Sequence, residues 1–336
     1  MRQRFFLLTG AVLLFVMMAL GQSANGPTKK IGEPPRRADG QPDLEGIWSS
    51  ATLTPLERPP AFAGKPFFTP EEARAFEKRT IQERNADRRG ANGQADLALA
   101  YNDAWWDWGT KVAKTLQTSL VVDPADGRVP PYTAEAQRRI AARNEAMQER
   151  CARTTCVPSV FSLLPADGPE DRSLMDRCML FPEEGLPMLP SAYNNNYRIV
   201  QASGSVTILM EMIHDARVIP LDGRPHLPQN LRQWLGDSRG HWEGNTLVVD
   251  TTNFTGQTRF RDSTPNMKLR ERFTRADADT LIYEFTVDDP ETFTRPWTAS
   301  IPLNRTEGPL FEYACHEGNH GMEGMLSGAR AQEKAR

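Results

Sequence analysis

The residues best suited to acid–base or metal chemistry lie in the second half of the chain. All five histidines fall between positions 214 and 320: His214, His226, His241, His316 and His320. An imidazole titrates near neutral pH, so it can act as a base, an acid or a metal ligand. Asp215 follows His214 directly, and Arg217 lies two residues further on, so a carboxylate and a fixed cation could flank it. We expect His214 to be a catalytic base, with Asp215 or Glu317 as its partner acid.

This expectation for His214 depends on the strand that begins near Val206. If the strand runs unbroken, His214 shares one face with four apolar residues, since alternate side chains of a strand point the same way. Those residues are Val206, Ile208, Met210 and Met212. The alternative is that His214 is a hydrogen-bonded core residue. Strand alternation places Asp215 on the opposite face unless the chain bulges or turns there.

His316, Glu317 and His320 match the H-E-x-x-H pattern of zinc peptidases. That chemistry needs a helix, because two histidines four residues apart reach one zinc ion when they share a helical face. Here the motif follows a predicted strand at 310–315 and contains Gly318, a poor helix former. We therefore expect no cofactor. A zinc-dependent hydrolase, with zinc bound by His316 and His320, is the alternative.

Two loop segments are predicted at strand ends, where the loops of a β-fold often carry function. They are residues 222–226 and 240–247. We expect Arg217 and His226 to position an anionic or hydroxylated substrate. We also expect Trp242 and Asn195 to contact a ligand, with packing and turn formation as the alternative roles.

The elements that must position these residues are β-strands. From residue 197 to residue 315, short runs alternate apolar and polar side chains and are separated by dipeptides such as Asp-Gly and Gly-Asn. Alternation at period two buries one face of each strand and leaves the other in water. The predicted strands are 197–202, 206–213, 216–221, 246–254, 269–275, 280–288, 297–303 and 310–315.

About eight antiparallel strands predict a lipocalin-like β-barrel, which closes its edges and encloses one small ligand. An open β-sandwich is the alternative. We expect residues 191–320 to form the barrel core and 321–336 a tail or short helix. Residues 43–190 are predicted to add a first strand with helical and proline-rich elaborations. Within them, Thr69 starts a capping box with Pro70 at the first helical position, and Thr133 begins a second helix.

The first residues are typical of an export signal. A basic start, Arg2 and Arg4, precedes an apolar run too short for a stable membrane anchor, so we expect cleavage after residue 21. Residues 22–42 are predicted to form a flexible arm. The formal net charge is −3, so we expect no basic surface that would bind nucleic acid or an anionic membrane. We expect a soluble periplasmic or extracellular protein, with a small molecule as its partner and an oligomeric state that the sequence leaves open.

Four cysteines accompany this predicted export to an oxidising compartment, which favours disulfides. They are Cys151, Cys156, Cys178 and Cys315. Four cysteines allow three pairings, and sequence does not choose between them. We prefer Cys151–Cys156 and Cys178–Cys315.

Five segments of the chain resemble a large uncharacterised family of secreted bacterial proteins. They are DLEGIW at 43–48, Arg177-Cys178, DGRPH at 222–226, WEGNTLVVD at 242–250 and YACHE at 313–317. The start of this match, Gly46-Ile47-Trp48, is also similar to the lipocalin opening motif. The resemblance implies no activity. Relatives in that family often carry an aromatic residue where this chain has His320, which implies more weight for His226 and Glu317 than for a zinc motif.

Taken together, the sequence predicts a secreted β-barrel protein that binds a small organic ligand. As an enzyme it would perform acid–base chemistry such as hydrolysis, elimination or isomerisation. The zinc hydrolase is the second hypothesis, and a non-catalytic surface or assembly protein is the third.

Overall fold

The computed structural model describes residues 34–85, 87, 92–93, 104, 106–152, 166–181, 185–258 and 260–334. The predicted signal segment, most of the predicted arm and Cys156 lie outside these ranges. The predictions made for them therefore stay predictions.

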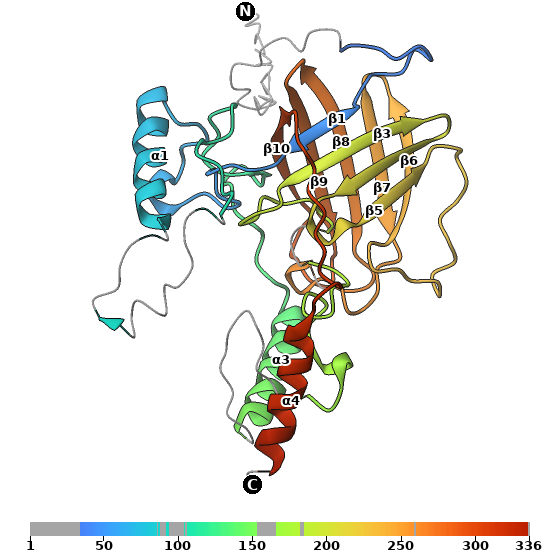
Figure 1. The fold of residues 1–336 in the computed structure, drawn as a ribbon. Coiled ribbons are helices and arrows are strands. Elements are labelled where there is room, and N and C mark those ends of the chain that lie inside the picture. The colour runs from blue at the N-terminus through green and yellow to red at the C-terminus, as the bar shows by residue number, and fades with distance from the viewer. Residues whose placement is uncertain are drawn as a thin grey trace, which may run out of the picture. The chain divides into compact units, whose positions relative to one another are not determined.

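Most of the described strands belong to one antiparallel sheet of ten strands (Figure 1). The strand order is β5-β4-β3-β1-β10-β9-β8-β7-β6, and β2 pairs with β10 outside this path. The strands are β1 (Gly46–Ser49), β2 (Val121–Asp123), β3 (Asn196–Ala202), β4 (Ser205–Met210), β5 (Ala216–Pro220), β6 (Asp237–Glu243), β7 (Thr246–Thr252), β8 (Lys268–Asp277), β9 (Thr280–Asp288) and β10 (Trp297–Thr306). The prediction of a mainly β, antiparallel fold is confirmed. The predicted strand at 310–315 is wrong, because that segment has no regular secondary structure.

The sheet is not closed into a barrel, because no ladder joins its two end strands within the described residues. Every pairing in the path is antiparallel, so strand direction alternates along it. The path holds nine strands, so its first and last members, β5 and β6, run in the same direction. An antiparallel ladder cannot join them, and within the described strands no ladder does. The closed lipocalin-like barrel is therefore not observed, whereas an open sheet fits this arrangement.

Side chains, not backbone ladders, link the two edges. The guanidinium of Arg217 on β5 donates from Nε to the Ser238 hydroxyl on β6 over 2.9 Å. Two residues after Ser238, Gly240 allows β5 and β6 to approach each other closely. A Cβ atom at position 240 would come within 2.8 Å of the Ile219 side chain and 2.7 Å of the Leu221 side chain. Any larger residue at 240 would therefore require the Ile219 or Leu221 side chain to shift.

The interior of the sheet is filled by large side chains. On β9, the alternating residues Leu281, Tyr283, Phe285 and Val287 all have no exposed surface, as the alternation predicts. Their neighbours across the core include fully buried aromatic residues of other strands, namely Trp48, Trp297, Tyr197 and Phe273. Protein interiors pack to the density of organic crystals, so full burial of such large groups leaves no room for a ligand among them. The expected hollow is therefore not seen among these residues.

Within the described residues, α-helices lie between β1 and β2, between β2 and β3, and after β10. They are α1 (Pro70–Arg84), α3 (Ala134–Ala152) and α4 (His320–Lys334). Thr69 forms the predicted capping box with Glu72, since its hydroxyl accepts from the Glu72 N–H and the Glu72 carboxylate accepts from the Thr69 N–H. The Thr133 hydroxyl likewise accepts from the N–H of Ala136 at the start of α3, over 3.1 Å. Of the helices in the described ranges, none is both long and apolar enough to cross a membrane.

Candidate functional site

His214 does not lie on the apolar face of β4. The strand ends at Met210, and Met212–His214 form a 3-10 turn in which Ile213 and His214 have φ of 60° and 61°. The turn is closed by the Met210 N–H, which donates to the carbonyl of Asp215 over 2.8 Å. His214 is exposed as a result. The burial argument for His214 as a base is therefore wrong, because the strand does not continue unbroken.

The H-E-x-x-H segment is not a zinc-peptidase helix. His320 is the first residue of α4, whereas His316 lies in the turn before it, so the two histidines do not share a helical face. His316, Glu317 and His320 are all exposed. Across the part of the chain that the structure describes, no three His, Cys, Asp or Glu side chains form a group suited to a metal ion.

A cavity of about 710 Å³ lies at the gap between β5 and β6. Its wall combines charged and aromatic side chains from three places: the end of the β4–β5 turn and β5, the segment before β6, and the start of β6. The chemically notable lining residues are Asp215, Arg217, Arg232, Trp234, Asp237 and Arg239. Two predicted site residues, Asp215 and Arg217, are therefore brought to one cavity.

Arg217 belongs to a buried ionic network at this cavity. Its guanidinium forms a two-pronged ion pair with Glu271 on β8, one prong being 3.0 Å long, and also donates to Thr251 over 2.9 Å. The side chain of Arg217 is 4% exposed and that of Glu271 is not exposed. The Tyr283 hydroxyl donates to Glu271 over 2.9 Å, and burial, followed by the Glu271 charge, raises the pKa of Tyr283 well above its usual range. Tyr283 therefore stays a phenol that donates to Glu271.

Glu271 is a residue that sequence reasoning missed. The signal is present in the alternation of β8, where Glu271 occupies an inward position between Leu269 and Phe273. A carboxylate on the buried face of a strand requires a partner, since an isolated buried charge is strongly unfavourable. That partner is Arg217, an inward residue of β5.

His226 is not among the residues that line this cavity, but its ring contacts Asp237, which does line it. The imidazole Nδ1 lies 2.9 Å from Asp237 Oδ2, which also accepts from the N–H of Leu227 over 3.0 Å. The other oxygen, Oδ1, pairs with Arg239 over 2.8 Å. Because a carboxylate accepts hydrogen bonds, this contact favours a proton on Nδ1, and in the neutral ring Nε2 then carries the lone pair. The side chain of His226 is 31% exposed, whereas that of Asp237 is 5% exposed.

The remaining predicted site residues lie elsewhere. Asn195 is fully buried, and its amide is used to hold main-chain groups of Ser191 and Asp107. Trp242 is partly buried and packs against the core of the sheet. Glu317 lies in the turn before α4 and does not line the cavity. The structure therefore brings together Asp215, Arg217 and, through Asp237, His226.

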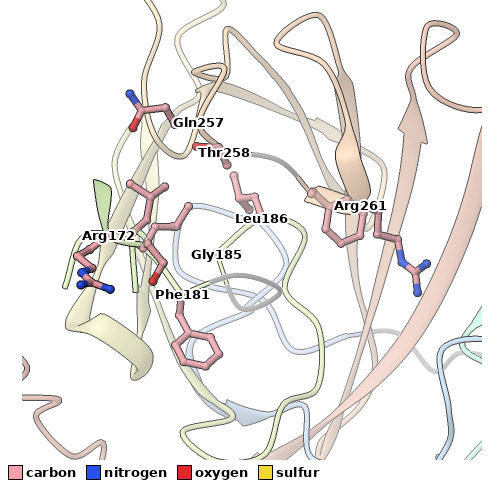
Figure 2. A pocket seen from close by; sticks show the side chains of 11 residues that line it. Arg172, Phe181, Gly185, Leu186, Gln257, Thr258 and Arg261 are labelled. Atoms are coloured by element: carbon pink, nitrogen blue, oxygen red, sulfur yellow. The ribbon is translucent and has the colours of Figure 1, made fainter. Parts of the chain in front are cut away.

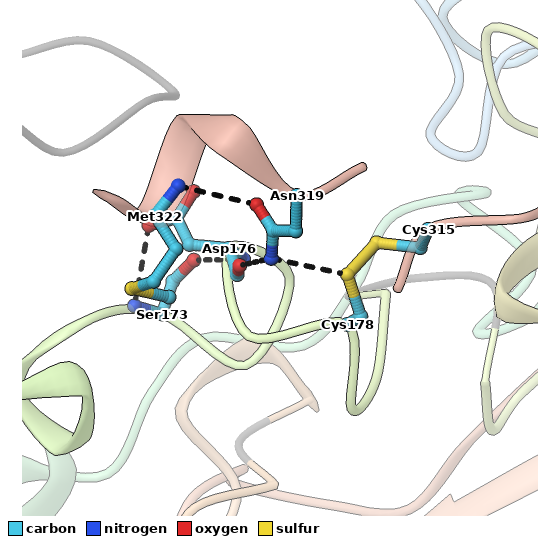
Figure 3. The surroundings of a disulfide bond; sticks show 6 residues. All are labelled: Ser173, Asp176, Cys178, Cys315, Asn319 and Met322. Atoms are coloured by element: carbon cyan, nitrogen blue, oxygen red, sulfur yellow. Dashed lines mark hydrogen bonds between the residues drawn. A yellow bond between two sulfur atoms is a disulfide. The ribbon is translucent and has the colours of Figure 1, made fainter. Parts of the chain in front are cut away.

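The disulfide between Cys178 and Cys315 is confirmed. Figure 3 shows Asn319, the residue before α4, beside it. The Asn319 amide donates to the Asp176 carbonyl over 2.9 Å, and its oxygen accepts from the N–H of Met322 over 3.2 Å. The start of α4 is therefore fastened to the 173–178 segment by both covalent and hydrogen bonds. Of the predicted Cys151–Cys156 pair, Cys156 lies outside the described residues, so this pair stays a prediction.

Asp215 gives a pH-dependent prediction. Burial raises its pKa, so the folded state holds a proton on Asp215 at pH values where the unfolded chain has lost it. The stability that protonated Asp215 contributes is therefore fully present below about pH 3.9, the usual pKa of Asp. It is lost as the pH rises through the folded-state pKa. Asp215→Asn should leave the free energy of unfolding unchanged in acid and raise it at neutral pH by less than about 1 kcal/mol.

Urea denaturation of both proteins across this pH range measures the difference. If Asp215→Asn increased the free energy of unfolding most in acid, the predicted direction of the pH dependence would be wrong.

In comparisons with protein-family models, curated proteins and solved structures, nothing matches this chain. The resemblance to a secreted family stays a prediction.

Proposed function

We propose that the protein binds a small organic molecule with hydroxyl or carboxylate groups in the cavity between β5 and β6, and that His226 transfers a proton there. The observation that carries this proposal is the Asp237 carboxylate, which both lines the cavity and holds His226. A volume of about 710 Å³ is in the range of small-molecule sites. Such sites use a few polar groups in a mostly apolar pocket to orient the ligand.

The wall supports a polar ligand. Arg239 offers N–H donors, although its charge is paired with Asp237 over 2.8 Å. Arg232 adds positive charge: among the described residues, its contacts include the main-chain carbonyls of Phe254 and Pro265 and no carboxylate. Trp234 offers an aromatic surface beside them. Guanidinium groups bind carboxylates and hydroxyl oxygens through directed N–H donors. This set suits a sugar acid or a hydroxylated aromatic acid.

The Asp237–His226 pair supports proton transfer. With its proton on Nδ1, the imidazole accepts a substrate proton at Nε2, and the Asp237 carboxylate stabilises the resulting imidazolium. In an elimination or isomerisation, the same proton returns from Nε2 to the leaving group or the product carbon, so His226 ends in its starting form. The proposal therefore assigns the base to His226, whereas the sequence suggested His214.

The test combines a ligand screen with matched variants. Galacturonate, gluconate, glucose and hydroxybenzoate are each added to the purified protein, and a bound ligand should raise the melting temperature by about a few degrees. Arg239→Gln should weaken binding of the acidic ligand about tenfold or more, since it removes a charged hydrogen-bond donor. His241→Gln is the control, because His241 is an exposed histidine that pairs with Glu243 and does not line the cavity.

Nitrogen-15 NMR of the His226 ring tests the proton-transfer role. The wild-type ring should carry its proton on Nδ1, and Asp237→Asn should alter this tautomer. The proposal fails if no ligand class shifts the melting temperature, or if Arg239→Gln and His241→Gln bind the ligand equally well. A ring protonated at Nε2 in the wild type would contradict the assignment of His226 as the base.

A further inference from the structure

Asp215 lines the cavity between β5 and β6, and its carboxylate has no bonding partner among the contacts of the described residues. Its main-chain carbonyl accepts from Met210, but its side chain takes part in no hydrogen bond or ion pair there. The backbone of Asp215 is extended, with φ of −74° and ψ of 141°, so it continues the alternation of β5. Asp215 therefore shares a face with Arg217 and Ile219, whose side chains are buried.

Two arginines of the same wall are already matched by other carboxylates. Arg217 pairs with Glu271, and all three nitrogens of its guanidinium donate to groups other than Asp215. Arg239 pairs with Asp237 over 2.8 Å. Because each of these pairs is internally neutral, neither offsets the charge of Asp215.

Arg232 is the remaining charged residue of the wall. Its guanidinium donates to two main-chain carbonyls and to the amide oxygen of Asn266, so its positive charge has no carboxylate partner within the described contacts. Arg232 and Asp215 also form no ion pair with each other there. One negative and one positive charge therefore remain at a single cavity.

Trp234 supplies an aromatic surface at this cavity. Its side chain is partly buried, and among the described residues its indole ring packs against no other aromatic ring. A carboxylate attracts an ammonium ion by charge and hydrogen bonding, and an aromatic face attracts it through the electrons of the ring. The cavity therefore contains both kinds of group that bind an ammonium ion.

The unpaired carboxylate carries a cost for the ligand-free protein. Burial disfavours its charged form and raises the pKa of Asp215. Groups that are retained at the expense of stability are typical of binding sites. The ammonium group of a ligand would supply the opposite charge that the fold does not provide.

A second cavity, of about 390 Å³, does not offer this combination. Figure 2 shows Phe181 and Leu186 at its wall, and among the described residues that line it none is Asp or Glu. An ammonium ligand is therefore expected at the cavity between β5 and β6.

We propose that Asp215 binds an ammonium group of the ligand, so that the cavity between β5 and β6 takes a zwitterion, namely a hydroxylated amino acid such as an amino-sugar acid. This inference rests on the proposed function, in which Arg239 and Arg232 bind the carboxylate, and it adds the amino group. Asp215 is thus the residue that selects the ligand, whereas the proton transfer stays with His226.

Four ligands separate the two charges. Glucose carries neither charge, glucosamine carries the ammonium group alone, gluconate carries the carboxylate alone, and glucosaminate carries both. Titration calorimetry is performed at neutral pH, where an amine of this kind is largely protonated. Glucosaminate should bind the wild-type protein at least about tenfold more tightly than gluconate, since it adds a charged hydrogen bond. Glucosamine should likewise bind more tightly than glucose.

Asp215→Asn has nearly the same shape as the wild type and lacks the charge. It should bind gluconate as the wild type does and lose the preference for glucosaminate. Because this variant is expected to be at least as stable as the wild type at neutral pH, unfolding would not explain the loss.

Two further variants provide the controls. Asp250→Asn should keep the preference for glucosaminate, because Asp250 pairs with Arg270 over 2.8 Å and does not line the cavity. Arg239→Gln should show the reverse of Asp215→Asn: weaker binding of both acids, with the preference for glucosaminate retained.

Equal wild-type affinity for gluconate and glucosaminate would overturn this inference, as would an unchanged preference in Asp215→Asn. Either result would leave the proposed function standing, because gluconate would still bind. Loss of the preference in Asp250→Asn as well would refute the assignment to Asp215. If none of the four ligands binds, the inference and the proposed function both fail.

Discussion

Replacing Glu271 with alanine is expected to lower the free energy of unfolding by about 3–5 kcal/mol, the usual cost of removing one partner of a buried ion pair. Arg217 would keep its charge in a position that is 4% exposed, and its guanidinium would lose two of its acceptor contacts. The Tyr283 hydroxyl would also lose the oxygen to which it donates. Because Arg217 joins β5 to the other edge of the sheet through Ser238, we expect the gap between β5 and β6 to loosen as well.

An exposed ion pair of the same sheet is the matched control. Glu243 pairs with Arg272 over 2.8 Å, and both side chains are at least 39% exposed. Glu243→Ala should therefore cost less than about 1 kcal/mol. Urea denaturation measures both losses. A loss for Glu271→Ala as small as that of Glu243→Ala would show that water reaches the Arg217 guanidinium.

The double variant Arg217→Met/Glu271→Leu tests the cause. It removes both charges and leaves apolar groups of similar size, so it should be more stable than Glu271→Ala alone. If the double variant is as unstable as the single one, the loss comes from packing and not from an unpaired charge.

The second large effect is expected from the disulfide. Cys178→Ser/Cys315→Ser should lower the free energy of unfolding by about 2–5 kcal/mol, since the bond closes a long loop and so restricts the unfolded chain. The two cysteines are 137 residues apart, and the loop between them includes all strands from β3 to β10. The variant should also loosen the start of α4, which Asn319 and the disulfide fasten to the 173–178 segment.

Reduction of the wild-type protein provides the control. A thiol reductant should lower the stability of the wild type much more than that of the variant, because the variant has only the predicted Cys151–Cys156 bond left to reduce. Cys151→Ser/Cys156→Ser should cost less, since a bond between those residues would close a short loop. Equal stability of the wild type and Cys178→Ser/Cys315→Ser would show that the bond adds nothing to the fold.

The sequence by itself determined local structure well. The alternation at period two predicted the inward face of β9, where Tyr283 and Phe285 are fully buried. The Gly244-Asn245 turn joins β6 to β7, and Gly244 has the positive φ of 59° that such a turn requires. Capping by Thr69 was also predictable, because the cap and its partner Glu72 are three residues apart. These features depend on neighbours in the chain, so a short stretch of sequence contains them.

The site depends on residues distant in the chain, and so only the tertiary structure decided it. Arg217 was predicted to bind substrate, yet Glu271, which lies 54 residues away, occupies its guanidinium. His214 was predicted to be buried, but the β4–β5 turn at Met210 exposes it. Alternation predicts which side chains point inward, but it does not predict the curvature of the sheet. It therefore could not distinguish a hollow interior from a filled one. The gap between β5 and β6 lies between the two ends of a nine-strand path, and no single segment specifies that order of strands.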